Sequence, residues 1–243
     1  MINLHDVTFP NPAENLALDE ALLNHAEENI GEESLRFWES PTDFIVLGVG
    51  NKIEQEINSE ACIKQSIPVL KRCSGGGSVV QGPGCLNYSL ILSIQKRPQL
   101  ADITKTTQYI LAQLKEALSK HLDGVDIKGQ SDLTLYNKKF SGNAQRRKRH
   151  YVLFHGTFLI DFDITKISRY LAPPPKQPEY RQNRPHSDFV TNLPITEDII
   201  KQALIQQWHA KKTNTKLPPL TSLLSSKYAD LRPESPFDMI QTI

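Results

Sequence analysis

The 243-residue chain is long enough to bury a substantial core, either as one large domain or as two small ones. Hydrophobic residues make up 39% of it and charged residues 23%, and 28 Lys and Arg face 27 Asp and Glu. This near-neutral balance excludes the strongly basic or acidic character of nucleic-acid and membrane-surface binders, so any electrostatic specificity must be local.

The N-terminal residues and the cysteines indicate the cellular compartment and the redox state of the protein. The first six residues have no basic flank or long apolar run, and no later segment reaches the length of a membrane span, which predicts a cytoplasmic protein. Cys62, Cys73 and Cys85 are odd in number and lack CxxC spacing. They are therefore expected to be reduced thiols, not a disulfide framework or a zinc site.

The first half of the chain predicts one helix followed by strands. Asn11 is a suitable cap, Pro12 suits the first helical turn, and Glu14 can reach back to the cap amide. Apolar residues then follow at helical spacing. The later segments are short, rich in β-branched and aromatic residues and broken by Pro or Gly, which predicts neighbouring strands at residues 35–39, 44–48 and 67–70, and a longer one at 87–93.

The second half predicts further helices and strands. Residues 102–122 carry a single apolar stripe typical of an amphipathic helix. Further elements are expected as follows: a hairpin at 133–141, a strand at 151–163 with a bulge or a close ligand approach at Gly156, an irregular proline-rich surface loop at 171–184, a helix at 197–211, and a loosely packed tail from Leu217. The order of elements predicts a mixed α/β (α+β) fold in which helices flank mixed sheets.

A glycine-rich loop is the most informative local feature. Arg72-Cys73-Ser74-Gly75-Gly76-Gly77-Ser78-Val79-Val80 places three adjacent glycines behind an arginine. Such a loop can be a plain turn, but it also lets backbone amides approach an anion closely. It matches neither the phosphate loop GxxxxGK[ST] nor a GxGxxG fingerprint.

A second loop, Lys139-Phe140-Ser141-Gly142-Asn143-Ala144, repeats the combination of cation, hydroxyl and glycine. Neighbours on a strand point to opposite faces, so one of Lys138 and Lys139 must face inward. We expect that residue to be Lys139, although a solvated lysine is the commoner case. An inward ammonium suits a carboxylate, a phosphate or a developing oxyanion.

Other charged residues leave alternatives open. Arg146-Arg147-Lys148-Arg149 is a solvated turn or a docking patch for phosphates or an acidic protein. Asp132 ends a strand, holds Mg²⁺ near phosphates, or orients an attacking amine. His155 is a core histidine or a site residue. Cys73 is a buried thiol or, with its pKa depressed by the arginine and the glycine loop, a nucleophile.

Taken in order, Arg72-x-Ser74-Gly75-Gly76-Gly77-x-Val79, Asn87, Asp132-Leu133, Lys139-x-Ser141-Gly142-x-Ala144 and His155-Gly156-Thr157 resemble the lipoate-protein ligase A family of the biotin/lipoate ligase superfamily. Residues 15–20 and 190–193 also match that family. The similarity spans residues 12–193. It implies a single catalytic domain over residues 1–243, in which residues 194–243 form a C-terminal helix and tail.

The resemblance implies activation of lipoate or octanoate with ATP and Mg²⁺ to an acyl-adenylate, and transfer to a lysine of a lipoyl domain or a glycine-cleavage H protein. Lys139 is then the catalytic residue, and Asp132 a candidate metal ligand. The implied substrate- and nucleotide-binding residues are Arg72, Ser74, Gly75, Gly76, Gly77, Ser78, Val79, Val80, Asn87, Asp132, Ser141, Gly142, Asn143, Ala144, His155 and Gly156. The acyl chain needs an apolar slot, for which Trp38, Phe44, Val79 and Leu90 are candidates.

The chain also departs from the family pattern. Ligases of this type often carry an accessory domain, and the stretch after Leu193 is too short for one, so a separate accessory subunit is one possibility. Octanoyltransferases share the scaffold but pass the acyl group from acyl carrier protein through a cysteine thioester, for which Cys73 or Cys85 would have to serve. A non-catalytic binder of acyl groups or lipoyl domains is a third alternative. A biotin ligase is disfavoured because a GRGRxxR-type loop is absent.

Overall fold

The computed structural model describes residues 1–29, 32–173 and 177–232. Within these residues the strands form one eight-stranded and one three-stranded sheet. The large sheet has the order β11 (Ala210–Lys212), β1 (Ile2–Asp6), β2 (Glu33–Trp38), β6 (Cys85–Ser93), β10 (Tyr151–Leu159), β9 (Lys138–Arg147), β8 (Asp132–Leu135) and β7 (Val125–Lys128). The small sheet has the order β4 (Val69–Lys71), β3 (Phe44–Leu47) and β5 (Val79–Gln81).

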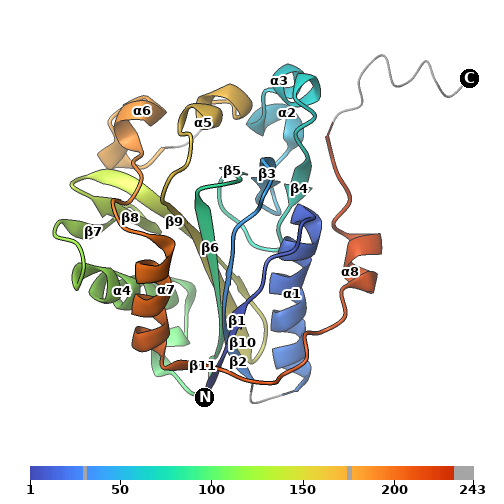
Figure 1. The fold of residues 1–243 in the computed structure, drawn as a ribbon, viewed down its shortest axis with the longest axis vertical. Coiled ribbons are helices and arrows are strands. Elements are labelled where there is room, and N and C mark those ends of the chain that lie inside the picture. Colours follow the sequence, from blue (N-terminus) through green and yellow to red (C-terminus); the bar gives the residue numbers. More distant parts are fainter. Residues whose placement is uncertain (30–31, 174–176, 233–243) are drawn as a thin grey trace, which may run out of the picture.

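The helices lie on both sides of the large sheet (Figure 1). They are α1 (Pro12–Glu28), α2 (Ile53–Glu56), α3 (Ser59–Lys64), α4 (Ile103–Ser119), α5 (Thr165–Tyr170), α6 (His186–Phe189), α7 (Glu197–Trp208) and α8 (Thr221–Ser226), with short 3-10 turns at Pro98–Leu100 and Glu179–Arg181. Helices α4 and α7 lie on one side, and α1 lies on the other with the small sheet. None of the described helices is both long and apolar enough to cross a bilayer.

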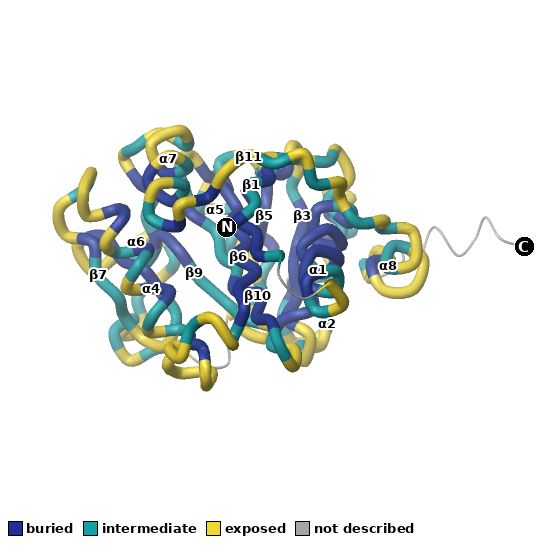
Figure 2. Tube along the Cα trace, turned by 90° about the horizontal axis from the view of Figure 1, so that it is seen from below, coloured by how far each residue is buried: buried dark blue, intermediate teal, exposed yellow. Residues whose placement is uncertain are grey.

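The arrangement confirms the expected mixed α/β fold with flanking helices. Strand β1 pairs in parallel with β11 and with β2, whereas the pairings from β2 through β6, β10, β9 and β8 to β7 are antiparallel. The central strands β6 and β10 are buried over most of their length, as the dark tube in Figure 2 shows. A sheet covered on both faces needs such continuously apolar strands.

Helix α1 begins where its capping residues predict. The side chain of Asn11 accepts a hydrogen bond from the amide of Ala13 at 3.0 Å, and Pro12 occupies the first helical position. Leu18, Leu22 and Leu23 pack in one buried cluster with Tyr151 and Leu153 of β10. This packing fixes α1 against the face of the sheet on which the cavities described below open.

Two expectations about strand and helix limits are wrong. Strand β2 belongs to the large sheet, so residues 35–39 do not neighbour β3 and β4. The last long helix ends at Trp208, and His209 takes a left-handed conformation (φ 50°) that turns the chain into β11 beside β1. A helix pattern does not reveal such a short edge strand, because three residues carry no detectable period.

The expected loose tail is also wrong as far as the structure describes it. Helix α8 packs against α1, and Tyr228 is only 3% exposed. The Tyr228 hydroxyl donates to Glu20 at 2.6 Å, and the amide of Leu231 donates to the carbonyl of Val69 at 2.8 Å. Residues 233–243 lie outside the described part of the chain.

The proline-rich segment is not merely a surface loop. Residues 174–176 lie outside the described residues. After them the Tyr180 ring packs on Phe189 with ring centroids 5.1 Å apart, and Arg184 donates to the carbonyl of Asn137 at 3.3 Å. The segment therefore lies against the β8–β9 hairpin, beside the inward-facing lysine.

Candidate active site

Two adjoining cavities lie between the glycine-rich loop and strands β9 and β10. Their volumes are about 190 Å³ and about 600 Å³. The walls that they share consist of Gly76, Gly77, Ser78, Val79, Gln81, Asp132, Lys139, Gly142 and Thr157. The two loops singled out in the sequence are thus brought to one place.

The carbonyl groups of the glycine loop all face the protein. Arg72 Nη2 donates to the carbonyls of Gly75 at 2.6 Å and Gly77 at 2.8 Å. Asn51 Nδ2 donates to the carbonyl of Gly76 at 3.2 Å. The guanidinium of Arg72 therefore binds the carbonyl groups of the glycine loop. Burial lowers the pKa of Arg72 to about 10.

This tethering decides where the loop amides point. In a planar trans peptide, the carbonyl of one residue and the N–H of the next point in opposite directions. With three successive carbonyls held by Arg72 and Asn51, the N–H groups of Gly76, Gly77 and Ser78 face away from those side chains. Over the described residues these amides donate to no other group. They form a cradle of free donors suited to an anion.

Gly76 is required at its position for two reasons. Its φ of +92° lies where L residues are strained. A Cβ there would also approach Arg72 Nη2 to 2.9 Å. Any side chain would thus loosen the contact between Arg72 and the loop.

Lys139 faces inward and Lys138 outward, as the alternation of the strand predicts. Lys138 is exposed, whereas Lys139 Nζ lies 2.7 Å from Asp132 Oδ1 in the wall of both cavities. The absence of a side chain at Gly142 makes room for the lysine, because a Cβ there would lie 3.0 Å from Nζ.

Both oxygens of Asp132 have partners. Oδ1 pairs with Lys139, and Oδ2 accepts a hydrogen bond from the Tyr180 hydroxyl at 2.7 Å. The described residues contain no cluster of three or more His, Cys, Asp or Glu side chains suited to a metal ion. The donor set therefore fits Mg²⁺ only as an ion held chiefly by substrate phosphates, with Asp132 as one oxygen ligand.

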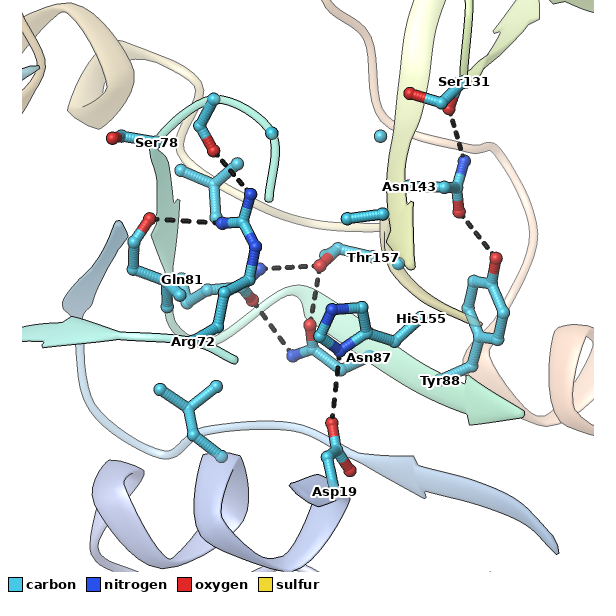
Figure 3. A pocket seen from close by; sticks show the side chains of 18 of the residues that line it. Asp19, Arg72, Ser78, Gln81, Asn87, Tyr88, Ser131, Asn143, His155 and Thr157 are labelled. Atoms are coloured by element: carbon cyan, nitrogen blue, oxygen red, sulfur yellow. Dashed lines mark hydrogen bonds and ion pairs between the residues drawn. The ribbon is translucent and has the colours of Figure 1, made fainter. Parts of the chain in front are cut away.

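A closed ring of hydrogen bonds supports the floor of the smaller cavity (Figure 3). Gln81 donates to Thr157 at 2.6 Å, Thr157 donates to Asn87 at 2.6 Å, and Asn87 donates back to Gln81 at 3.0 Å. Each group is both donor and acceptor, so the ring is internally satisfied. Asn87 is thereby a fixed wall residue.

A second set of contacts holds Asn143. Its side-chain oxygen accepts from Tyr88 at 2.6 Å, and its amide nitrogen donates to the carbonyl of Ser131 at 2.8 Å (Figure 3). A Cβ on Gly156 would collide with the Asn143 side chain. The pairing of β10 runs through Gly156 without a register shift, so the bulge alternative is wrong, and the space beside Gly156 is taken by Asn143. A close approach of a ligand there stays a prediction.

The smaller cavity has an apolar side. Leu16, Trp38, Val46 and Val79 line it. The prediction that Phe44 and Leu90 line the slot is wrong, because both are fully buried in the core and lie in neither cavity wall. The slot is formed where α1 faces the small sheet.

The larger cavity combines an apolar side with charges of both signs, since Glu56 and Asp132 line it as well as Lys139 and Arg181. Leu159, Phe162 and Ile167 belong to its apolar side. Arg181 and His186 line the wall together with Lys139. Burial, and next the positive charges of Arg181 and Lys139, lower the pKa of His186. Arg181 Nε donates to the carbonyl of Arg184 at 3.0 Å and its guanidinium lies over the Phe189 ring; among the described residues it makes no ion pair with a carboxylate.

The cysteines are poor nucleophiles in this structure. Cys73 is 3% exposed, and burial is the main cause that raises its pKa to about 12. Burial likewise raises the pKa of Cys85, which is fully buried. Neither lies in the wall of the two cavities. The expectation of a depressed Cys73 pKa is wrong, since the arginine beside it turns toward the glycine loop.

The four basic residues 146–149 do not all have the same role. Arg147 donates to Thr106 Oγ1 at 2.9 Å and to the carbonyl of Leu100 at 2.7 Å, and so ties β9 to α4. Arg146, Lys148 and Arg149 are exposed. None of the four lines either cavity. Docking of an acidic protein to them stays a prediction.

Most of the predicted site residues line a cavity. The exceptions are Ser74, which is 1% exposed behind the loop, and Gly75, which lies outside both walls. The sequence reasoning missed Asp19, Tyr180, Arg181 and His186. Asp19 has a detectable signal, because with Asn15 it puts two polar residues one turn apart on the apolar face of α1.

The sequence of this chain is similar to that of known families and proteins. A family model for the lipoyl protein ligase A/B catalytic domain matches residues 11–209. A probable lipoate-protein ligase A of Mycoplasma pneumoniae is 32% identical over 164 residues, which cover 66% of this chain and 46% of the relative. An octanoyltransferase LipM of Carboxydothermus hydrogenoformans is 33% identical over 181 residues, 65% of each chain. The chain thus spans about half the length of the Mycoplasma relative.

Solved structures show the same fold. A bi-partite lipoate protein ligase of Thermoplasma acidophilum, described with its E2 lipoyl domain, has a TM-score of 0.77 at 22% identity and covers 93% of this chain and 92% of that chain. A lipoate-protein ligase A bound with ATP has a TM-score of 0.72 at 20% identity, with coverages of 93% and 95%. Both carry the mixed α/β architecture expected from the sequence.

Proposed function

The chain belongs to the family of lipoyl protein ligase A/B catalytic domains, and from this premise we propose that it is a lipoate-protein ligase. It activates lipoate or octanoate with ATP and passes the acyl group to a lysine of a lipoyl domain or H protein. The supporting observation is that Lys139 and the free amides of Gly76, Gly77 and Ser78 lie where an apolar slot meets a larger cavity that Arg181 also lines.

In the first step, a carboxylate oxygen of the fatty acid attacks the α-phosphorus of ATP. A new P–O bond forms, the bond to the β-phosphate oxygen breaks, and pyrophosphate leaves. Two anions must meet for this to happen, so the chief demand on the protein is charge neutralisation and alignment. Lys139 neutralises the carboxylate and the α-phosphate, and the loop amides hold their oxygens.

The two cavities suit the two substrates. The acyl tail enters the slot beside Leu16, Trp38 and Val46. The nucleotide occupies the larger cavity, where apolar side chains receive the base and Arg181 and His186 receive phosphates. Asp132 would hold a Mg²⁺ ion together with the substrate phosphates, and that ion would supply charge screening there.

In the second step, the amine of the acceptor lysine attacks the acyl carbonyl. An amide bond forms, the bond to AMP breaks, and the amine proton is released. The loop amides stabilise the oxyanion that develops on the carbonyl. A lipoyl domain as acceptor is supported by the Thermoplasma ligase, which is described with one, and its bi-partite nature supports a separate accessory subunit here too. We further propose that residues 1–243 form one catalytic domain acting in the cytoplasm.

A second candidate function is octanoyl transfer, which the name of the Carboxydothermus relative favours. It would require an acyl thioester on a cysteine. All three cysteines of the chain are buried, and burial raises the pKa of each. We therefore rank the ligase first.

The deciding experiment is ATP–pyrophosphate exchange with octanoate or lipoate, combined with the intact mass of the protein after incubation with each acyl donor. A ligase exchanges pyrophosphate and forms no covalent adduct. A transferase shows no exchange and gains one acyl group from octanoyl acyl carrier protein. Absence of exchange with both acids rejects the ligase.

A further inference from the structure

Asp19, His155 and Ser74 lie in a row behind the glycine loop. His155 Nδ1 is 3.6 Å from Asp19 Oδ2 (Figure 3). Its Nε2 is 2.6 Å from Ser74 Oγ. This is the order of a nucleophilic triad. Ser74, however, is 1% exposed and lies in neither cavity wall. The row is therefore not arranged for attack by the serine on a substrate.

The proton positions in this row follow from its buried anchor. Asp19 is 2% exposed and pairs with the fully buried Arg36 at 2.5 Å. Burial alone would raise the pKa of Asp19, but Arg36 and His155 outweigh it and the pKa is lowered. An ionised carboxylate beside Nδ1 places the imidazole proton there and leaves Nε2 as an acceptor.

The remaining links reach the glycine loop. With Nε2 as acceptor, the Ser74 hydroxyl donates its proton to His155, and its lone pairs are free for Arg72. Arg72 Nε donates to Ser74 Oγ at 3.0 Å, and Nη2 of the same side chain holds the loop carbonyls. Arg72 Nε also donates to the carbonyl of Gly75 at 3.1 Å, so the same guanidinium joins Ser74 to the loop backbone.

We infer that Asp19, His155 and Ser74 form a positioning relay that orients Arg72 and thereby turns the amides of Gly76, Gly77 and Ser78 into the cavity. This inference deepens the proposed function and rests on it for its kinetic consequence. His155 does not act as a base on substrate, because both ring nitrogens already have partners within the protein. Arg72 is a positioning residue for the same reason.

The relay has a structural readout that needs no activity. In the intact protein, the ¹⁵N order parameters of the Gly75, Gly76 and Gly77 amides should be near about 0.85, the value of rigid backbone. In His155→Ala and in Ser74→Ala they should fall toward about 0.6. His155→Gln, whose amide keeps one donor and one acceptor, should recover much of the order. The exposed His121→Gln serves as the control and should leave the loop unchanged.

The kinetic readout separates positioning from binding. A misplaced amide cradle should lower kcat of pyrophosphate exchange in Ser74→Ala and His155→Ala by up to about 10²-fold, with little change in KM for octanoate. His155→Gln should restore part of kcat, and His121→Gln should match the wild type.

The outcomes are distinguishable. Loop order parameters that stay at the wild-type value in folded Ser74→Ala, or a loop that is already flexible in the wild type, overturn the relay. Ser74→Ala removes only one buried hydroxyl, so it keeps the test decisive if His155→Ala fails to fold. A wild-type protein without exchange activity rejects the proposed ligase function, while the order parameters still decide the relay.

Discussion

The Nζ of Lys139 lies 2.7 Å from Oδ1 of Asp132, and the other oxygen of that carboxylate is held by Tyr180. The Lys139 side chain nevertheless remains 31% exposed, on the side of the cavities. An ammonium has three donors, so one contact to Asp132 orients it and leaves others for a ligand. This geometry places an aimed positive charge opposite the loop amides.

Replacing Lys139 by Ala should lower the rate of pyrophosphate exchange by about 10²–10³-fold, since one preorganised charge-stabilising group is lost. The thermal midpoint should change little, because the side chain is partly solvated. The matched control is Lys138→Ala on the opposite face of the same strand, which should keep wild-type activity. Equal losses in both variants would refute the assigned role.

Tyr180→Phe removes the hydrogen bond to Asp132 but keeps the ring on Phe189. We expect kcat to fall about tenfold, in line with the loss of one hydrogen bond to a charged group, about 1.5–3 kcal/mol at most. Tyr136→Phe is the control, as Tyr136 is 72% exposed. Unaltered exchange rates in Tyr180→Phe would mean that Lys139 needs no second support.

Arg181→Ala should raise KM for ATP by about tenfold or more while kcat changes less, because a charge-assisted contact to phosphate is worth about 1.5–3 kcal/mol. The exposed Arg169 on the neighbouring helix α5 gives the control variant Arg169→Ala. Steady-state kinetics at varied ATP measure the difference. A normal KM in Arg181→Ala would remove this residue from the nucleotide site.

Asp19→Asn should destabilise the fold by about 3–5 kcal/mol, because it leaves the buried guanidinium of Arg36 without its counter-charge. The folded-state pKa of Asp19 is lowered below its ordinary 3.8. Its contribution is therefore fully present above pH 3.8 and is lost as the pH falls through the lower folded-state pKa.

Urea denaturation of the wild type and of Asp19→Asn at pH 7 and at pH 3 measures this contribution. The difference in free energy of unfolding between the two proteins should be full at pH 7 and begin to decrease only near pH 3. Asp161→Asn, at an exposed site, should show no such difference. Equal free energies of unfolding of the wild type and Asp19→Asn at pH 7 would contradict a stabilising ion pair between Asp19 and Arg36.

The native protein should resist alkylation at Cys73. With a pKa of about 12, only about one thiol in 10⁴ is ionised at pH 8, and the thiolate is the reactive form. Iodoacetamide followed by peptide mass mapping should label Cys73 only after denaturation. Rapid native labelling at Cys73, together with an octanoyl adduct there, would favour the transferase.

The sequence predicted the parts of the site that depend on local chemistry. The cap of α1, the stripe of α4, the inward lysine of the β8–β9 hairpin and the glycine loop all follow from neighbours in the chain. Arg72 was predicted beside the loop, yet its contacts with the loop carbonyls could not be, because they depend on how the loop folds back.

The rest depends on contacts between distant segments. The ion pair of Asp19 and Arg36 joins α1 to β2, and Tyr180 reaches Asp132 from a proline-rich segment with no period to read. Tyr228 is buried by α1 although its own segment carries little pattern. Such pairings are set by tertiary packing, which local propensity does not encode.

Lys139 and the amides of Gly76, Gly77 and Ser78 are proposed to bind one ligand together. This can be measured by NMR titration with a non-hydrolysable octanoyl-adenylate analogue. We expect the three amide resonances and the Lys139 side-chain resonance to shift together along one saturation curve. Saturation of the protein with either the amides or the lysine unmoved would contradict it.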